Sequence, residues 1–439
     1  MASDRTGRRQ RRRGIFQRPA NRPLAGTLGG PPSVCVQPNA EGNERSVWAT
    51  THSVGDLQEP KYQGNVDKSQ KMTADFQRGD TALNGICPYF TMFPLDFPLN
   101  ILKRRARAGD VVLDPFCGRG TTNFAARLVG LRSLGVDSSP VAAAVTASKL
   151  ATTTVDDILT EARSILTERE ARHIPTSEFW QWAYHPTVLD ALCRFREAFL
   201  EDCTTDARIA LRGIVLGALH GPKQKTFPSY FSNQCPRTYA PKPAYATRFW
   251  RSRGLSPEPI DVLAVIERRA KRYYGSSHDT AGTVRLADSR QAEALQPETP
   301  EIRFDWLITS PPYYGMRTYI PDQWLRNWFV GGSDVVDYSS SDQIVHSSPE
   351  DFAEDLRRVW RNASEVCAED AKMVIRFGGI TDRRANPLDL IKSSLSDSGW
   401  RITTIREAGS ATEGKRQADA FLRTKSKPMV EYDVWAAKV

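Results

Sequence analysis

The chain has 439 residues, of which 40% are hydrophobic and 25% charged, an ordinary composition for a folded protein with a sizeable core. The seven cysteines and six histidines are scattered, without the spacing of a disulfide framework or a metal site, and this favours a reducing, cytoplasmic setting. Because no apolar run approaches the roughly 20 residues that a membrane helix needs, we expect no membrane segment.

The formal net charge of +9 is concentrated in two regions. Residues 1–25 contain eight Arg and one Asp, and residues 223–272 contain eleven Lys and Arg against three acidic residues, so the rest of the chain is mildly acidic. Two basic regions on an acidic body suit a polyanionic partner such as nucleic acid. A solvated tail and a solvated helix face are the alternative interpretation.

The order of the elements predicts an α/β protein with an insertion. Residues 1–80 are a basic, largely disordered arm, and residues 81–155 contain strands at 111–114 and 133–137 that are each followed by a helix. Residues 156–280 are mainly helical. Residues 281–439 return to strands, which we expect at 283–288, 304–310, 372–379, 400–409 and 429–439. Because no helix separates the last two strands, they should pair antiparallel at one edge of an otherwise parallel sheet.

A glycine-rich loop follows the first strand in LDPFCGRGTT, residues 113–122. Glycines between a strand and a helix let the backbone approach a ligand closely, and the helix N-terminus favours a negative group. Asp137 ends the next strand, where a carboxylate can accept both hydroxyls of a ribose. A tight structural turn is the alternative, but the pattern predicts a nucleoside-bearing ligand.

Two features favour S-adenosylmethionine over a dinucleotide. Asn123 occupies the slot where a dinucleotide fingerprint has its third glycine. Asp114 would repel a pyrophosphate but suits the ammonium of a methionine group. Asp288, after the third strand, is a candidate acceptor for the adenine amino group or, alternatively, a helix cap. The candidate cofactor-binding residues are Asp114, Pro115, Phe116, Gly118, Gly120, Thr121, Thr122, Asp137 and Asp288.

A second unusual stretch, TSPPYYGM at residues 309–316, follows the apolar strand FDWLI. Pro311 and Pro312 cannot donate to a sheet ladder and stiffen the exit from the strand. The stretch is therefore either a rigid turn with aromatics folded into the core or a rigid ledge that presents a hydroxyl, carbonyls and aromatic faces.

Together, LDPFCGRGTT and the later TSPPYY resemble the paired signature of DNA amino-methyltransferases, which methylate N4 of cytosine or N6 of adenine. The segment CPYFTMFPLDFPLNIL before the loop resembles the part of these enzymes that lies over the methionine end of the cofactor. The resemblance covers about residues 85–150 and 283–436. It implies a Rossmann-like class I methyltransferase sheet, mostly parallel with an antiparallel edge strand, and an inserted helical target-recognition region. It also implies S-adenosylmethionine as cofactor and double-stranded DNA as partner.

The resemblance assigns Ser310, Pro311, Pro312 and Tyr313 to catalysis. The Ser310 hydroxyl and the Pro311 carbonyl can accept the two hydrogens of an exocyclic amine and aim its lone pair at the methyl group. A flipped base can stack on Tyr313, with Tyr314 as a second wall. In the family, SPPY accompanies cytosine N4 more often than adenine N6, so cytosine N4 is the expected acceptor.

Residues 225–254 interleave basic and aromatic side chains, which suits contact with phosphates and base edges. Arg268, Arg269, Lys271 and Arg272 either join this surface or form a solvated helix face. Adenine N6 methylation, guanine-N2 methylation of tRNA and a catalytically dead DNA-binding homologue are the alternatives, and a separate cognate restriction endonuclease is left open. The candidate DNA-binding residues are Tyr314, Asn233, Gln234, Arg237, Lys242, Arg248, Arg251 and Arg253.

Overall fold

The computed structural model describes residues 80–88, 93–221, 228–233, 242–275, 280–315, 320–336, 348–379, 385–410 and 430–439. The predicted N-terminal arm up to residue 79 lies outside the described residues, as do Gln234 and Arg237.

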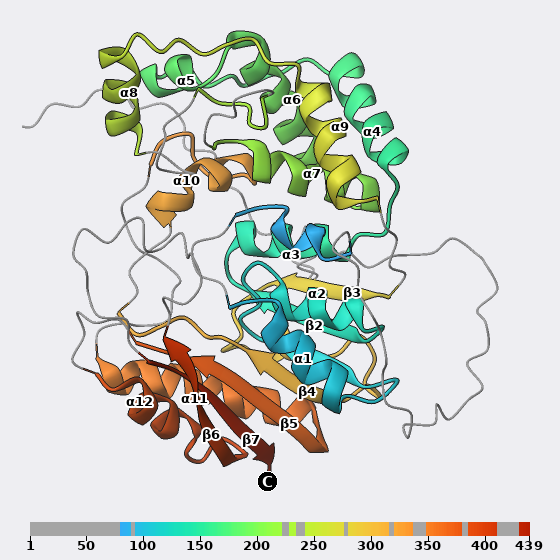
Figure 1. Cartoon of the computed structure of the whole chain (residues 1–439), viewed down its shortest axis with the longest axis vertical. Coiled ribbons are helices and arrows are strands. Elements are labelled where there is room, and N and C mark those ends of the chain that lie inside the picture. The colour runs from blue at the N-terminus through green and yellow to red at the C-terminus, as the bar shows by residue number, and fades with distance from the viewer. Residues whose placement is uncertain are drawn as a thin grey trace, which may run out of the picture. The chain divides into compact units, whose positions relative to one another are not determined.

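Seven strands of the described residues form one sheet in the order β3-β2-β1-β4-β5-β7-β6 (Figure 1). Parallel pairing joins the first five strands of that order, and β7 runs antiparallel to both β5 and β6. The predicted α/β sheet and the antiparallel pair are therefore confirmed, with β7 lying between β5 and β6. The strands are β1 (Val111–Asp114), β2 (Arg132–Asp137), β3 (Gly282–Leu286), β4 (Phe304–Thr309), β5 (Cys367–Phe377), β6 (Trp400–Ser410) and β7 (Val430–Lys438).

Helices cover both faces of this sheet, as its continuous apolar strands require. The helices α1 (Asp96–Arg105), α2 (Thr121–Leu128) and α3 (Pro140–Leu150) share one core cluster with Val112, Ile308 and Val374 of the sheet. A second cluster joins the opposite face to η2 (Ala292–Leu295), α11 (Pro349–Val366) and α12 (Pro387–Leu395). Side-chain caps followed by proline start α3, α11 and α12 at Ser139, Ser348 and Asn386.

The helical insertion lies in the chain between α3 and β3. It comprises α4 (Val155–Glu168), α5 (Glu178–Ala183), α6 (Pro186–Glu201), α7 (Asp206–Ala218), α8 (Pro243–Ser252) and α9 (Val262–Tyr273). A later helix, α10 (Ile320–Phe329), packs with it: the Trp324 ring lies 4.8 Å from Phe179, and the Trp328 ring lies 4.4 Å from Trp180. The next described element after the SPPYY stretch is thus a helix that is anchored in the insertion.

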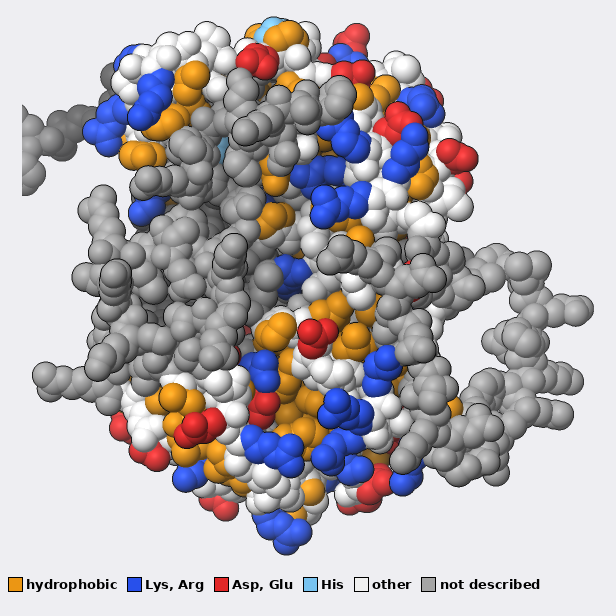
Figure 2. Space-filling model, viewed as in Figure 1, with side chains coloured by type: hydrophobic (Ala, Val, Ile, Leu, Met, Phe, Trp, Pro, Cys, Tyr) orange, Lys and Arg blue, Asp and Glu red, His pale blue; other side chains and the backbone are white. Residues whose placement is uncertain are grey.

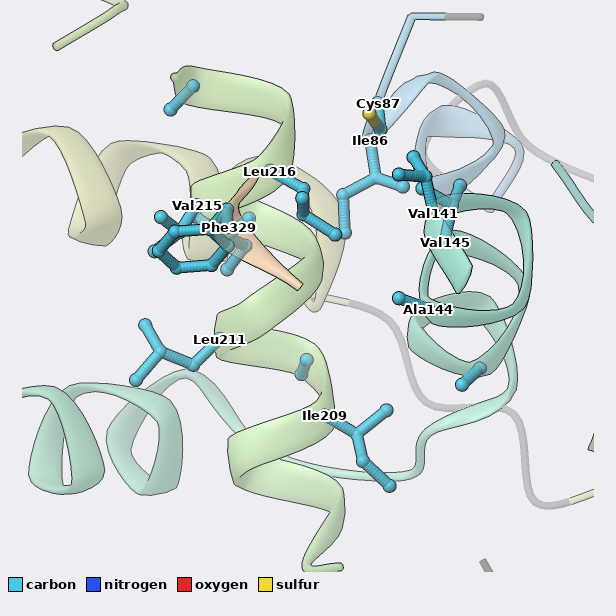
Figure 3. Close-up of a cluster of buried hydrophobic side chains, with 14 of the residues drawn as sticks. Ile86, Cys87, Val141, Ala144, Val145, Ile209, Leu211, Val215, Leu216 and Phe329 are labelled. Carbon is cyan, nitrogen blue, oxygen red and sulfur yellow. The ribbon is translucent and has the colours of Figure 1, made fainter. Parts of the chain in front are cut away.

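Close packing of α7 joins the insertion to the sheet-covering helices. A Cβ atom on Gly213 would lie 2.3 Å from Ser148 Cβ on α3, and one on Gly217 would lie 2.0 Å from the Ile86 carbonyl oxygen. In Figure 3, Leu216 of α7 points toward Ile86, and Phe329 of α10 lies against Val215. Glycines one turn apart therefore allow a backbone approach that alanine would block. In the described part of the chain, no helix is both long and apolar enough to span a membrane.

Candidate active site

The carboxyl ends of β1, β2 and β4 lie side by side, because β1 pairs in parallel with both neighbours. This end of the strands, as distinct from the outermost strands, is called the carboxyl edge of the sheet. Open α/β sheets bind ligands at this edge. The glycine loop follows β1, Asp137 ends β2, and Ser310 follows β4. The two stretches that the sequence singles out, almost two hundred residues apart, are therefore neighbours at one edge.

Asp114 is the most deeply buried carboxylate of this edge, with no exposed surface. Its Oδ1 accepts hydrogen bonds from Thr309 Oγ1 at 2.6 Å and from the Phe116 amide at 3.1 Å. Its Oδ2 is buried and has no hydrogen-bond partner among the described residues. Burial raises the pKa of Asp114 from 3.8 to about 6, against the opposing effect of these hydrogen bonds. An unpaired buried carboxylate oxygen is costly, and a cationic ligand would compensate it.

The glycine loop adopts the conformation that its two glycines permit. Gly118 and Gly120 have φ angles of 52° and 71°, in the left-handed region. A Cβ atom on Gly120 would lie 2.7 Å from the Thr146 side chain, whereas one on Gly118 would meet nothing within 4 Å. Gly120 is therefore required for packing, while the space beside Gly118 is open to a ligand.

Asp137 holds the loop in place and remains half-buried at the edge. Its Oδ2 accepts from the Gly118 amide at 2.9 Å, and its Oδ1 accepts from the Ser139 amide at 2.8 Å. Burial raises the pKa of Asp137, and the two backbone hydrogen bonds oppose that rise. Each oxygen can accept a further hydrogen bond, so the carboxylate can still meet ribose hydroxyls.

The other predicted loop residues have structural contacts. The Thr122 hydroxyl donates to the Ile308 carbonyl at 3.1 Å and so ties α2 to β4, and it also lies close enough to Asp114 to lower the pKa of that carboxyl. Thr121 is buried. The Pro115 carbonyl accepts from the Ser289 hydroxyl at 2.6 Å. Phe116 stands edge-to-face against Trp360 of α11, with ring centroids 5.8 Å apart.

Asp288 is engaged by a neighbouring arginine. Arg290 Nη2 lies 2.7 Å from Asp288 Oδ2, Arg290 Nε lies 3.1 Å from Oδ1, and the Arg290 amide donates to Oδ1 at 2.9 Å. Burial acts to raise the pKa of Asp288, but the Arg290 hydrogen bonds outweigh it and the net shift is downward. Arg290 also pairs with Asp355 on α11. These contacts favour the structural interpretation of Asp288 over a role as adenine acceptor.

The SPPYY stretch starts beside the cofactor loop. Thr309, the residue before Ser310, donates the hydrogen bond to Asp114 and is fully buried. Pro311 is buried, whereas Ser310 and Pro312 are half-buried. Within the described residues, the Ser310 hydroxyl makes no hydrogen bond, so it is available to a substrate.

Tyr313 is fixed by a residue that sequence reasoning missed. Its hydroxyl donates to Glu431 Oε1 at 2.7 Å, and Glu431, on β7, is only 3% exposed. The Tyr313 ring stands edge-to-face against Phe377, with centroids 5.4 Å apart, and Tyr314 stands likewise against Phe352. Both tyrosine rings are half-buried and held at defined angles. No local pattern links Glu431 to a tyrosine 118 positions earlier.

A buried polar cluster behind the loop was also missed. Arg119, between the two loop glycines, donates to the Asn84 carbonyl oxygen, and Lys149 Nζ donates to Asn84 Oδ1 at 2.9 Å. Burial lowers the pKa of Arg119 to about 10 and that of Lys149 well below its usual range. The cluster attaches the segment before α1 to the cofactor loop.

The described DNA-binding candidates divide into two groups. The Asn233 side chain donates to the carbonyl oxygens of Trp182 and Leu255, which makes it a brace within the insertion. Lys242, Arg248, Arg251 and Arg253 are exposed at or beside α8. Of these, Arg251 pairs with Glu178, and Arg253 lies 4.0 Å over the Phe249 ring.

The helix α9 contributes less than its composition suggests. Arg268 donates to the Pro228 carbonyl, Arg269 donates to the Ser229 carbonyl, and Lys271 pairs with Glu267 within the helix. Part of this basic stretch therefore braces the insertion or forms a solvated helix face.

The strand order, the loop after β1 and the carboxylates at the strand ends define a Rossmann-like class I methyltransferase fold. A family model described as DNA methylase matches residues 12–148. The type II methyltransferase M.MjaII of Methanocaldococcus jannaschii is 40% identical over 58 residues, which are 13% of this chain and 11% of that protein. Both matches are to DNA methylases, and neither spans half of this chain.

Solved structures with a related course of the chain include two methyltransferases. The rRNA methyltransferase aviRa from Streptomyces viridochromogenes is 12% identical, over 82% of this chain and 94% of that one, with a TM-score of 0.31. A SAM-dependent methyltransferase from Methanosarcina mazei is 10% identical, over 79% and 98%, with a TM-score of 0.29. These scores are low, so the fold assignment rests on the strand order itself.

The family match supports S-adenosylmethionine as the cofactor, and the residues present fit it. The unpaired Asp114 Oδ2 suits an ammonium group, the open space beside Gly118 admits a ligand against the backbone, and Asp137 retains acceptor capacity for hydroxyls.

Proposed function

We propose that the protein transfers the methyl group of S-adenosylmethionine to an exocyclic amino nitrogen of a base in double-stranded DNA, with N4 of cytosine as acceptor. The observation that carries the proposal is the 2.6 Å hydrogen bond from Thr309 Oγ1 to Asp114 Oδ1. It joins the residue before Ser310 to the carboxylate before the glycine loop. One short hydrogen bond would therefore join the segment that holds the cofactor to the segment that holds the acceptor base.

The cofactor side depends on two carboxylates. Asp114 would hold the ammonium of the methionine group, and the charge of that group would favour the ionised form of Asp114. Asp137 would accept ribose hydroxyls while it keeps its hydrogen bonds to the loop backbone. When bound, the cofactor supplies an electrophilic methyl group.

The base side depends on Ser310, Pro311 and Tyr313. The Ser310 hydroxyl and the Pro311 carbonyl accept the amino hydrogens and so turn the nitrogen lone pair out of the ring and toward the methyl group. The same two acceptors stabilise the positive charge that grows on the nitrogen. Tyr313, held through its hydroxyl by Glu431, offers a ring on which the flipped base stacks. The proton can then leave to water, so no strong base is needed.

The proposal is tested by transfer of labelled methyl from S-adenosylmethionine to duplex DNA. Ser310→Ala should lower kcat by about 10²–10³-fold, the range for loss of one group that stabilises transition-state charge. Ser393→Ala, at an exposed position on α12, is the matched control and should retain full activity. Full activity of Ser310→Ala would contradict the role of the hydroxyl. Label that enters tRNA but not DNA would contradict the substrate class.

A further inference from the structure

Three strands present aligned side chains on the sheet face that α1 only partly covers. Directly paired residues of antiparallel strands point to the same face. Val374 and Trp435 pack with the core cluster that contains the α1 residues, which identifies this face as the α1 side. Its rows, from β5 through β7 to β6, are Lys372–Ala437–Arg401, Val374–Trp435–Thr404 and Arg376–Asp433–Arg406.

These rows and the end of α1 carry concentrated positive charge. Lys372, Arg401 and Arg406 are exposed, as is Arg105 at the end of α1. We name these four residues the cationic face. None of the four takes part in an ion pair with another described residue, while Asp433, the single carboxylate of the three rows, is bound at 2.7 and 2.8 Å by Arg376. Figure 2 shows Lys and Arg side chains gathered around hydrophobic atoms over α1 and β5.

Aromatic rings orient two of these charges. The Arg105 guanidinium lies 4.7 Å from the centroid of the Trp435 ring, and Lys372 Nζ lies 5.2 Å from that of Trp306. Stacking of this kind holds a cation in place at little further entropic cost on binding. Thr404 adds an exposed hydroxyl to the middle row. Oriented cations with hydroxyls between them suit phosphate oxygens.

The cationic face extends from the edge that holds the candidate active site. Arg376 and Arg406 belong to the Asp433 row, and Glu431, two residues from Asp433 on β7 and therefore on the same face, accepts the hydrogen bond from Tyr313. The Arg376 row and the Lys372 row are four residues apart on β5, which is about 13 Å along the strand. This distance equals the rise of roughly four base pairs of duplex DNA.

We propose that the cationic face binds the phosphodiester backbone of the substrate duplex beyond the flipped base. This inference rests on the proposed function, because it takes its occupant from the DNA substrate. It adds a contact surface on the sheet itself, separate from the basic residues of the helical insertion. The bound DNA is recognised there by charge alone, so the contact contributes affinity without sequence preference.

The test compares two triple variants of the full chain. One is Lys372→Gln with Arg401→Gln and Arg406→Gln. The control is Arg303→Gln with Arg361→Gln and Lys392→Gln, three exposed basic residues on the side of α11 and α12. Affinity for duplexes of about 40 and about 12 base pairs is measured by fluorescence anisotropy across a salt series without cofactor.

If all three residues contact phosphates, the cationic-face variant should lose about 2–3 units of salt slope on the long duplex. This corresponds to up to a few hundred-fold in affinity near 0.1 M salt. The loss should appear on both duplexes, because half of the short duplex already extends about 20 Å, and it should be absent in the control. Equal losses in both variants, or an unchanged slope, would overturn the proposal. Because no methyl transfer is measured, a failure of the proposed function would appear separately.

Discussion

Asp114 should make the folded protein less stable as the pH rises toward neutrality, and Asp114→Asn should remove that dependence. The pKa of Asp114 is raised by burial from 3.8 to about 6, so between these values the folded state binds more protons than the unfolded state. Stability from this group is fully present below the unfolded pKa and is lost as the pH rises through the folded pKa. A shift of about 2 pKa units corresponds to about 3 kcal/mol.

The assay is urea unfolding without cofactor at a series of pH values from about 4.5 to about 7.5. Across that range, the free energy of unfolding of Asp114→Asn minus that of the parent should rise by about 2 kcal/mol, because the stability from Asp114 is lost between pH 4.5 and the folded pKa of about 6. Burial of the amide introduced by Asp114→Asn changes the free energy of unfolding by an amount that does not depend on pH, and this amount cancels when values at different pH are compared. Glu298→Gln, which alters an exposed carboxylate, is the control and should show no comparable rise. A difference that stays constant with pH for Asp114→Asn would refute the reasoning.

Three further predictions test separate parts of the site. Asp114→Asn should also weaken S-adenosylmethionine binding about 10–100-fold by calorimetry, because a charge-assisted hydrogen bond contributes about 1.5–3 kcal/mol; unchanged affinity would exclude an ammonium contact there. Gly120→Ala should lower the free energy of unfolding by at least about 1–2 kcal/mol, because φ is 71° and the new methyl would lie 2.7 Å from Thr146; Gly85→Ala, with nothing within 4 Å, is its control. Glu431→Ala should lower kcat/KM for DNA about 10-fold or more, with partial rescue in Glu431→Gln, which keeps an acceptor for the Tyr313 hydroxyl; equal activity of all three proteins would remove Glu431 from the site.

The sequence was most informative where chemistry and strand ends coincide. Asp114, Asp137 and Ser310 follow short apolar strands, and parallel strands bring their carboxyl ends to one edge. Both the predicted parallel sheet and the antiparallel pair near its edge are present. The sequence locates these residues at the ends of strands, and the parallel direction of those strands then places the residues at the same end of the sheet.

The sequence was least informative for contacts that depend on the third dimension. Glu431 is the second residue of β7, and only the pairing of β7 with β5 brings it to Tyr313. Asp288 is predicted to accept a hydrogen bond from a ligand, and the sequence did not show that Arg290, two residues later, engages its carboxylate. Asn233 looked like a base reader, but its amide braces two loop carbonyls. Residue type indicated polarity correctly in each case, while the partner depended on packing.

Identification of the methylated nucleoside tests the proposed function most directly. The protein is incubated with S-adenosylmethionine and either duplex DNA or tRNA, and the digested nucleosides are analysed by mass spectrometry. We predict N4-methylcytosine in DNA, formed about 10²–10³-fold more slowly by Ser310→Ala. N6-methyladenine would contradict the choice of base while leaving the reaction class intact. Methylation of tRNA alone, or cofactor binding without any transfer, would contradict DNA methyl transfer itself.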